Sequence, residues 1–299
     1  MLKKLPSYIF VLLGFIVLLA SCKKDYETVQ NIDDRKIEDY LSKNNVQAIK
    51  DPQGTGFYYQ ITSQGTGDFY KNTDSVRYSV TVKSLLNGTV FYTTPESSNL
   101  STFVGYSSQL LGINIKAMLS TLTQLKAGGA ARIILPSYLA FGKNGYETLK
   151  VPSNEILEVT VKTYLEKQHV LDDNHIKAFL IANKITNAVK DASGVYYVLT
   201  TAGTGTNPIT LSSTLTTTYT GRFLDGAVFD SATDNASVLG SFIPGWAVLR
   251  NFKQGAVVRI IIPSILAYGS SGRRDSLGNL VIGGNACLDF DVSVTKVEN

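Results

Sequence analysis

Aromatic side chains and one carboxylate lie at close spacing in the second half of this 299-residue chain. Tyr219 and the pair Phe229-Asp230 come first, and Ile243-Pro-Gly-Trp246 follows. Trp246 is the only tryptophan in the chain. Rotation about an X-Pro bond crosses a barrier of roughly 18–20 kcal/mol, and an apolar enclosure disfavours the planar, more polar amide relative to the twisted one. A pocket walled by aromatic rings and holding one carboxylate is suited to lowering this barrier without a nucleophile or a proton transfer.

In order, spacing and residue type, this set and the later Ile262-Pro-Ser-Ile-Leu-Ala-Tyr268-Gly resemble the active-site signature of the FKBP family of peptidyl-prolyl cis-trans isomerases. The resemblance covers roughly residues 56–165 and 194–298, and it implies isomerase activity in the second half. It places Trp246 under the proline ring and makes the Ile243 N–H and the Tyr268 hydroxyl donors to the substrate. It also implies proline-containing polypeptide clients and binding of macrolide inhibitors. The site residues carried over are Tyr219, Phe229, Asp230, Phe242, Ile243, Trp246, Tyr268, Ile282 and Phe290.

Each of these residues also has a purely structural interpretation. Phe229 and Phe290 fall on alternating strand patterns, where an aromatic residue more often belongs to the core. Asp230 alone could cap a turn, and Trp246 after Pro-Gly could simply fill the core. Their joint occurrence in the family's order favours the functional interpretation.

The second half departs from the family pattern in three places. A loop that usually ends in Ile-Pro-Pro reads Ile282-Gly-Gly here, and the segment after Tyr268 carries extra residues that include Arg273 and Arg274. Asn235 or its neighbours stand where the family often has another pocket phenylalanine. These changes predict a more open pocket with lower turnover, in which binding survives better than rate.

The sequence contains an internal repeat of one unit. Gly65-Thr-Gly and Gly203-Thr-Gly match, and so do Ala131-Arg-Ile-Ile-Leu-Pro and Val258-Arg-Ile-Ile-Ile-Pro, with the second copy shorter by about eleven residues between them. Apolar residues at helical spacing predict a leading helix in each copy, with the paired aspartates at 33–34 and 172–173 suited to its N-cap and first turn. Short β-rich runs follow, together with a short helical segment that starts near Trp246.

These patterns predict an α+β fold. With the resemblance, they imply two tandem FKBP-like domains, each a twisted antiparallel sheet wrapped on a short helix and each preceded by an extra N-terminal helix. The predicted segments are a signal peptide at 1–22, a tether at 23–31, a degenerate FKBP-like domain at 32–168 and an FKBP-like domain with an intact signature at 169–299.

The first copy has lost most of the pocket residues. Tyr92 replaces the aspartate, Thr81 the first tyrosine and Met118 the tryptophan. Phe141 replaces the second tyrosine, and Val159 replaces the strand phenylalanine. Fold does not carry function once the site has changed, so we expect little or no isomerase activity from this copy.

The N-terminal residues predict export. Lys3 and Lys4 precede an apolar run at 8–19, and Leu19-Ala-Ser-Cys22 resembles the cleavage site of a bacterial lipoprotein signal. Cys22 is then the lipidated residue that holds the mature chain on a membrane, and we expect an outer-membrane lipoprotein that is periplasmic or surface-exposed. An ordinary signal peptide and a short membrane anchor are the alternatives.

Composition argues against several other functions. Removal of the signal lowers the formal charge from +4 to about +2, which is too small for nucleic-acid binding. Cys287 is the only other cysteine, so no disulfide is expected, and its apolar-alternating surroundings predict a buried small hydrophobe. The two histidines, His169 and His175, form no cluster with cysteines in the sequence, so neither a metal site nor a cofactor is expected.

The predicted function is that of a prolyl isomerase that assists the folding of exported envelope proteins. Two alternatives stay open. One is a non-catalytic binding or chaperone module that holds proline-containing or extended chains. The other is an envelope scaffold, which the altered first copy and the predicted anchor suggest.

Overall fold

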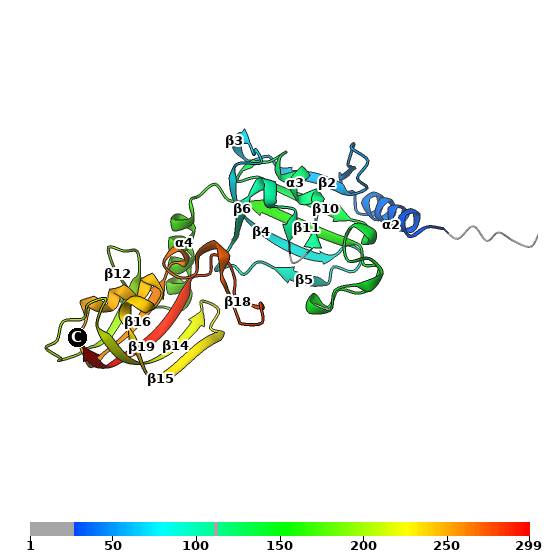
Figure 1. The fold of residues 1–299 in the computed structure, drawn as a ribbon. Coiled ribbons are helices and arrows are strands. Elements are labelled where there is room, and N and C mark those ends of the chain that lie inside the picture. The colour runs from blue at the N-terminus through cyan, green and yellow to red at the C-terminus, as the bar shows by residue number, and fades with distance from the viewer. Residues whose placement is uncertain (1–26, 111–112) are drawn as a thin grey trace, which may run out of the picture.

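The computed structural model describes residues 27–110 and 113–299, which contain two large antiparallel β-sheets in succession and three two-stranded ones (Figure 1). The predicted signal peptide with Cys22 lies outside the described residues. No described helix is long and apolar enough to cross a membrane.

The first half opens with an α-helix and then forms a seven-stranded sheet in the order β1-β2-β10-β11-β4-β5, with β6 also paired to β4. Its elements are α2 (Val29–Lys43), β1 (Ile49–Lys50), β2 (Tyr58–Ser63), β3 (Thr66–Phe69), β4 (Ser75–Ser84), β5 (Val90–Thr93), β6 (Leu100–Phe103), η1 (Val104–Tyr106), β7 (Gln109–Leu110), β8 (Ile113–Asn114), α3 (Lys116–Leu122), β9 (Lys126–Ala127), β10 (Ala130–Leu135), η2 (Ser137–Leu139), η3 (Gly142–Asn144), η4 (Glu147–Leu149) and β11 (Leu157–Thr163).

The second half repeats this plan with a six-stranded sheet in the order β12-β13-β16-β19-β14-β15. Its elements are α4 (Gln168–Ala182), β12 (Val189–Lys190), β13 (Tyr196–Ala202), β14 (Thr214–Phe223), β15 (Val228–Val238), η5 (Leu239–Ser241), η6 (Pro244–Asn251), β16 (Ala256–Ile262), η7 (Ser264–Leu266), η8 (Gly269–Ser271), β17 (Arg273–Arg274), β18 (Leu280–Ile282) and β19 (Leu288–Glu298). The predicted α+β class and the repeated architecture are confirmed.

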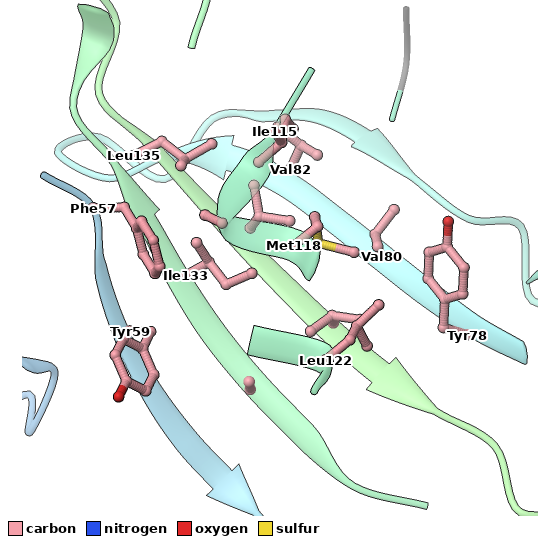
Figure 2. Close-up of a cluster of buried hydrophobic side chains, with 14 of the residues drawn as sticks. Phe57, Tyr59, Tyr78, Val80, Val82, Ile115, Met118, Leu122, Ile133 and Leu135 are labelled. Carbon is pink, nitrogen blue, oxygen red and sulfur yellow. The ribbon is translucent and has the colours of Figure 1, made fainter. Parts of the chain in front are cut away.

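In each half, a short helical segment packs on one face of the sheet and closes the core. In the first half this segment is α3, whose Met118 is buried among sheet residues such as Val80 and Ile133 (Figure 2). In the second half it is η6, which is a 3₁₀ helix and carries Trp246 into the equivalent core. The sheet alternates buried and partly exposed residues along β4, as a strand with one face on the core must.

The paired aspartates do not cap the leading helices, so that prediction is wrong. Helix α2 is capped by the Thr28 side chain, which accepts a hydrogen bond from the Asn31 N–H at 3.2 Å. Asp33 lies inside the helix, 2% exposed, and accepts hydrogen bonds from the N–H and hydroxyl of Ser137 at 2.8 and 2.7 Å. Its carboxylate therefore caps a distant 3₁₀ turn and docks the helix on the sheet.

The second half uses the same device. Asp172, inside α4 and fully buried, accepts hydrogen bonds from the Ser264 hydroxyl at 2.8 Å and from the Ile265 N–H at 3.3 Å. Because the tie recurs at the same place in both copies, we interpret it as the contact that makes each leading helix part of its domain.

Candidate active site

Three neighbouring strands and one 3₁₀ helix bring the predicted rings together. Strand β14 lies between β15 and β19, and it carries Tyr219, while β15 carries Phe229 and β19 carries Phe290. Trp246 enters the same space from η6. The sequence prediction that these four rings converge is what the structure shows.

The rings meet mostly edge to face, the arrangement that their quadrupoles favour. The centroid of Trp246 lies 5.3 Å from that of Tyr219 and 5.4 Å from that of Phe290, with interplanar angles of 85° and 75°. Phe229 lies 5.6 Å from Phe290 at 89°. The four rings form one connected cluster around Phe290.

Gly221 makes this packing possible, and the sequence analysis missed it. On β14 it pairs with Phe290 on one side and with Asp230 on the other. A Cβ atom at this position would lie 2.6 Å from Cε1 of Phe290 and 2.9 Å from Cζ of Phe229. A glycine inside a strand often marks a close approach by a neighbouring group, which is the signal that could have identified it.

We expect Gly221→Ala to disturb the ring cluster and to destabilise the second half by about 1–3 kcal/mol, the usual cost of overpacking. Isomerase activity, where present, should fall with it, because both displaced rings belong to the candidate site. Urea unfolding followed by Trp246 fluorescence measures the first effect. Gly283→Ala is the matched control, since nothing lies within 4 Å of a Cβ there, and an equal loss in both variants would contradict the prediction.

The indole of Trp246 is covered in this conformation. Trp246 is 1% exposed, and the Phe242 ring stacks on it in parallel at a centroid distance of 4.3 Å. Phe242 itself is partly exposed. A prolyl ring can therefore reach the indole face only if the Phe242 side chain rotates away.

One polar pair lies at the edge of the ring cluster. The Tyr219 hydroxyl donates a hydrogen bond to Oδ2 of Asp230 at 3.3 Å. Burial raises the pKa of Tyr219, and the neighbouring Asp230 carboxylate raises it further. The phenol consequently stays a neutral donor throughout the physiological range.

Ile243 and Tyr268, the two residues predicted to donate hydrogen bonds to the substrate, pack against the same core cluster. The Ile243 carbonyl accepts from the Trp246 N–H at 3.0 Å, whereas the Ile243 N–H makes no hydrogen bond to any residue that the structure describes. Tyr268 is partly buried, with the Arg273 guanidinium 5.9 Å from its ring centroid. Ile282 is fully buried within the same core cluster.

In the first half, aliphatic side chains occupy the place that the ring cluster has in the second half. Val80 pairs with Val161 as Tyr219 pairs with Val292, so the counterpart of Tyr219 is Val80, and the predicted counterpart Thr81 is wrong by one residue. The error arises because the turn from Lys83 to Val90 is one residue longer than the turn from Arg222 to Val228, so the offset of 138 that relates Tyr92 to Asp230 becomes 139 on the preceding strand.

Two further differences separate the halves. Val82 pairs with Val159 and with Tyr92, so a valine pair occupies the space that Gly221 and Phe290 fill in the second half. The Ile115 N–H, the counterpart of the Ile243 N–H, donates to the Ser108 carbonyl at 2.6 Å. At the corresponding described positions, the first half therefore has neither the ring cluster nor the free donor.

The second half thus combines a cluster of aromatic rings and one phenol–carboxylate pair with an antiparallel sheet. The sequence predicted this arrangement for a prolyl isomerase. The family model for the FKBP-type peptidyl-prolyl cis-trans isomerase matches this chain twice, at residues 67–164 and 205–295. The chain belongs to this family.

Named relatives agree with this assignment. A probable FKBP-type peptidyl-prolyl cis-trans isomerase, FkpA, of Neisseria meningitidis is 33% identical over 64% of this chain and 73% of its own length. The peptidyl-prolyl cis-trans isomerase Mip of Coxiella burnetii is 39% identical over 41% of this chain and 53% of its own length. The outer membrane protein MIP of Legionella longbeachae is 35% identical over 47% of this chain and 61% of its own length.

Proposed function

We propose that the second half, residues 169–299, is the active peptidyl-prolyl cis-trans isomerase of this chain and that the first half, residues 32–168, is an inactive copy. The observation that supports this most directly is the convergence of Trp246, Phe290 and Tyr219 beside Asp230. The first half has neither the ring cluster nor the free N–H donor.

The chemistry follows from the surroundings that these groups offer an X-Pro amide. A planar amide carries more charge on its oxygen than a twisted one, so transfer from water into an apolar ring cluster disfavours the planar form. Donors such as the Ile243 N–H and the Tyr268 hydroxyl hold the flanking backbone in one orientation. No group needs to gain or lose a proton.

The proposal extends to place and clients. Lipidation of Cys22 would anchor the chain, and its clients would be proline-containing polypeptides that fold in the cell envelope. The name of the Legionella relative, outer membrane protein MIP, supports placement at that membrane. A family-type macrolide should compete for the proline site.

A non-catalytic holding function is the second candidate. The covering of Trp246 by Phe242 favours it, because a site that must first move a ring binds and turns over more slowly than an open one. The two functions differ in whether the chain accelerates isomerisation or only prevents client aggregation.

A protease-coupled isomerisation assay with a short X-Pro peptide tests the proposal on the full chain with Cys22→Ser, which cannot be lipidated. We expect a cis-to-trans rate above the uncatalysed one, proportional to enzyme concentration and inhibited by a macrolide. A rate equal to background, together with suppression of client aggregation, would favour the holding function instead.

The hairpin β17–β18 predicts a preference for charge in the client. Arg273 lies over Tyr268 at the site and makes no ion pair with a described residue, whereas Arg274 donates to the Gly278 carbonyl at 2.8 Å and braces the hairpin itself. We expect peptides with glutamate before proline to be processed about two- to fivefold faster than those with lysine, since exposed charge pairs contribute up to about 1 kcal/mol.

Arg273→Gln should abolish this preference, and Arg274→Gln should retain it. Matched peptides that differ only in the residue before proline measure the ratio of kcat/KM values. Activity without any charge preference would contradict the role of Arg273 while leaving the isomerase proposal intact.

A further inference from the structure

Three side chains of different chemistry meet behind the second sheet, away from the ring cluster. Asp172 and His175 lie one helical turn apart on α4, so both face the same side, and Cys287 lies just before β19. One donor atom of each residue lies within 4.8 Å of the other two. Asp172 and Cys287 are buried, and His175 is partly buried.

The internal repeat separates what the fold needs here from what it does not. The first half keeps the aspartate and its hydrogen bonds, as Asp33 with Ser137. It has Lys36 at the position of His175 and, since Leu157 and Leu288 hold equivalent pairings, Ile156 at the position of Cys287. Docking of the leading helix therefore requires the carboxylate alone, and the imidazole and the thiol are additions of the second half.

The possible ligand atoms have lone pairs that no hydrogen bond uses. A carboxylate offers about four lone-pair sites, and Asp172 receives three protons, from the Ser264 hydroxyl, the Ile265 N–H and Nε2 of Gln168. Nδ1 of His175 is buried and has no hydrogen-bond partner.

The Cys287 thiol also lacks a strong hydrogen-bond partner. Its sulfur lies 3.9 Å from the Asp172 carbonyl oxygen, which is a weak contact. Two donors without a strong partner thus face a carboxylate that can accept one more interaction.

The imidazole and the thiol differ in protonation. Burial lowers the pKa of His175, and the opposing effect of Asp172 is smaller, so the imidazole is neutral as a metal ligand must be. Burial raises the pKa of the Cys287 thiol, and Asp172 adds to this. A divalent cation between them would reverse that rise by stabilising the thiolate.

We propose that Asp172, His175 and Cys287 form a binding site for a borderline divalent transition metal of the zinc class. Carboxylate oxygen, imidazole nitrogen and thiolate sulfur are the ligands that Zn²⁺ takes, and three protein ligands leave a fourth position for water. On binding, the thiol loses its proton to solvent and a metal–sulfur bond forms, with no change of oxidation state. His175 also lines a groove of about 490 Å³ that gives a route to solvent.

A metal ion bound at this site would cross-link two segments of the second half. It joins α4 to the segment that leads from the β17–β18 hairpin into β19, and that strand carries Phe290. A ligand that binds only the folded state stabilises it by mass action. The inference does not rest on isomerase activity.

The test titrates Co²⁺ into the full chain with Cys22→Ser, so that Cys287 is the only thiol, and without a histidine tag. We expect a thiolate-to-cobalt charge-transfer band that saturates at one Co²⁺ per chain and disappears on addition of Zn²⁺. Zn²⁺ should also raise the urea midpoint followed by Trp246 fluorescence. Absence of the band, or a band that Zn²⁺ does not displace, would overturn the proposal. A displaced band without any Zn²⁺ shift of the midpoint would overturn the stabilising role of the site.

Variants assign the ligands. His175→Lys, which copies the residue of the first half, should weaken Co²⁺ binding by roughly 100-fold or more, since even changes behind a metal ligand cost 10–100-fold. Cys287→Ala should remove the band and the Zn²⁺-dependent stabilisation together, while circular dichroism checks that it has folded. His169→Ala is the control and should bind as the parent does; equal affinity in His175→Lys and the parent would exclude the site.

Discussion

Replacing Trp246 with leucine is expected to lower kcat/KM for an X-Pro peptide at least about tenfold, a loss of roughly 1.4 kcal/mol of transition-state stabilisation. The ring centroid of Trp246 lies 5.3 Å from that of Tyr219 and 5.4 Å from that of Phe290, and the indole is the central apolar surface of the site. Leucine keeps a hydrophobic side chain there but leaves the enclosure incomplete. The protease-coupled assay on the full chain with Cys22→Ser measures the change.

Met118→Leu is the matched control in the first half, because Met118 is fully buried in the equivalent core. It should leave kcat/KM unchanged, within the small cost that volume-conserving core changes carry. Equal losses in the two variants would show that activity is not confined to the second half. If Trp246→Leu still suppresses client aggregation after losing its isomerase rate, holding and catalysis are separate properties of this chain.

The second large effect concerns the helix anchors. Asp33→Ala and Asp172→Ala should each destabilise their own half by about 3 kcal/mol, because each leaves buried N–H and hydroxyl donors without the charged acceptor that satisfied them. Urea unfolding resolves the two halves: Trp246, the only tryptophan, reports on the second, and far-ultraviolet circular dichroism reports on both. A chelator in the buffer keeps metal binding out of the comparison.

The expected pattern is asymmetric. Asp172→Ala should shift the fluorescence transition to lower urea, and Asp33→Ala should shift only a part of the dichroism signal. Lys36→Ala, on the exposed side of α2, is a control that should change neither by more than about 0.5 kcal/mol. An unchanged fluorescence midpoint in Asp172→Ala would show that the buried carboxylate does not anchor the helix.

The architecture could be predicted from the sequence because local patterns determine it. Short β-rich runs and the internal repeat predicted an α+β fold in two copies, and the family resemblance implied antiparallel sheets. The structure contains both sheets, and their strand orders are equivalent to each other. The aspartates were misassigned because a carboxylate next to a helix start looks the same whether it caps that helix or a turn about one hundred residues away, as Asp33 does with Ser137.

Part of the candidate site could also be predicted from the sequence, and part could not. The rings could be found because their types are rare and their order is specific. Gly221 and the correct counterpart of Tyr219 could not, since they depend on which residues pair across strands and on a one-residue difference in turn length between the two halves. The stacking of Phe242 on Trp246 depends on side-chain rotation, and the meeting of Cys287 with His175 depends on how the chain returns after a long separation.

The central claim is that the rings of the second half form a site that accepts a prolyl group. Titration of the full chain with Cys22→Ser by a family-type macrolide, followed by Trp246 emission, tests it directly because no other tryptophan contributes. The account predicts a saturable change in emission, with half-saturation at the concentration that halves isomerase activity, and a tighter interaction in Phe242→Ala, which uncovers the indole. Emission that stays constant in both the parent and Phe242→Ala would contradict it and would leave Trp246 as a core residue alone.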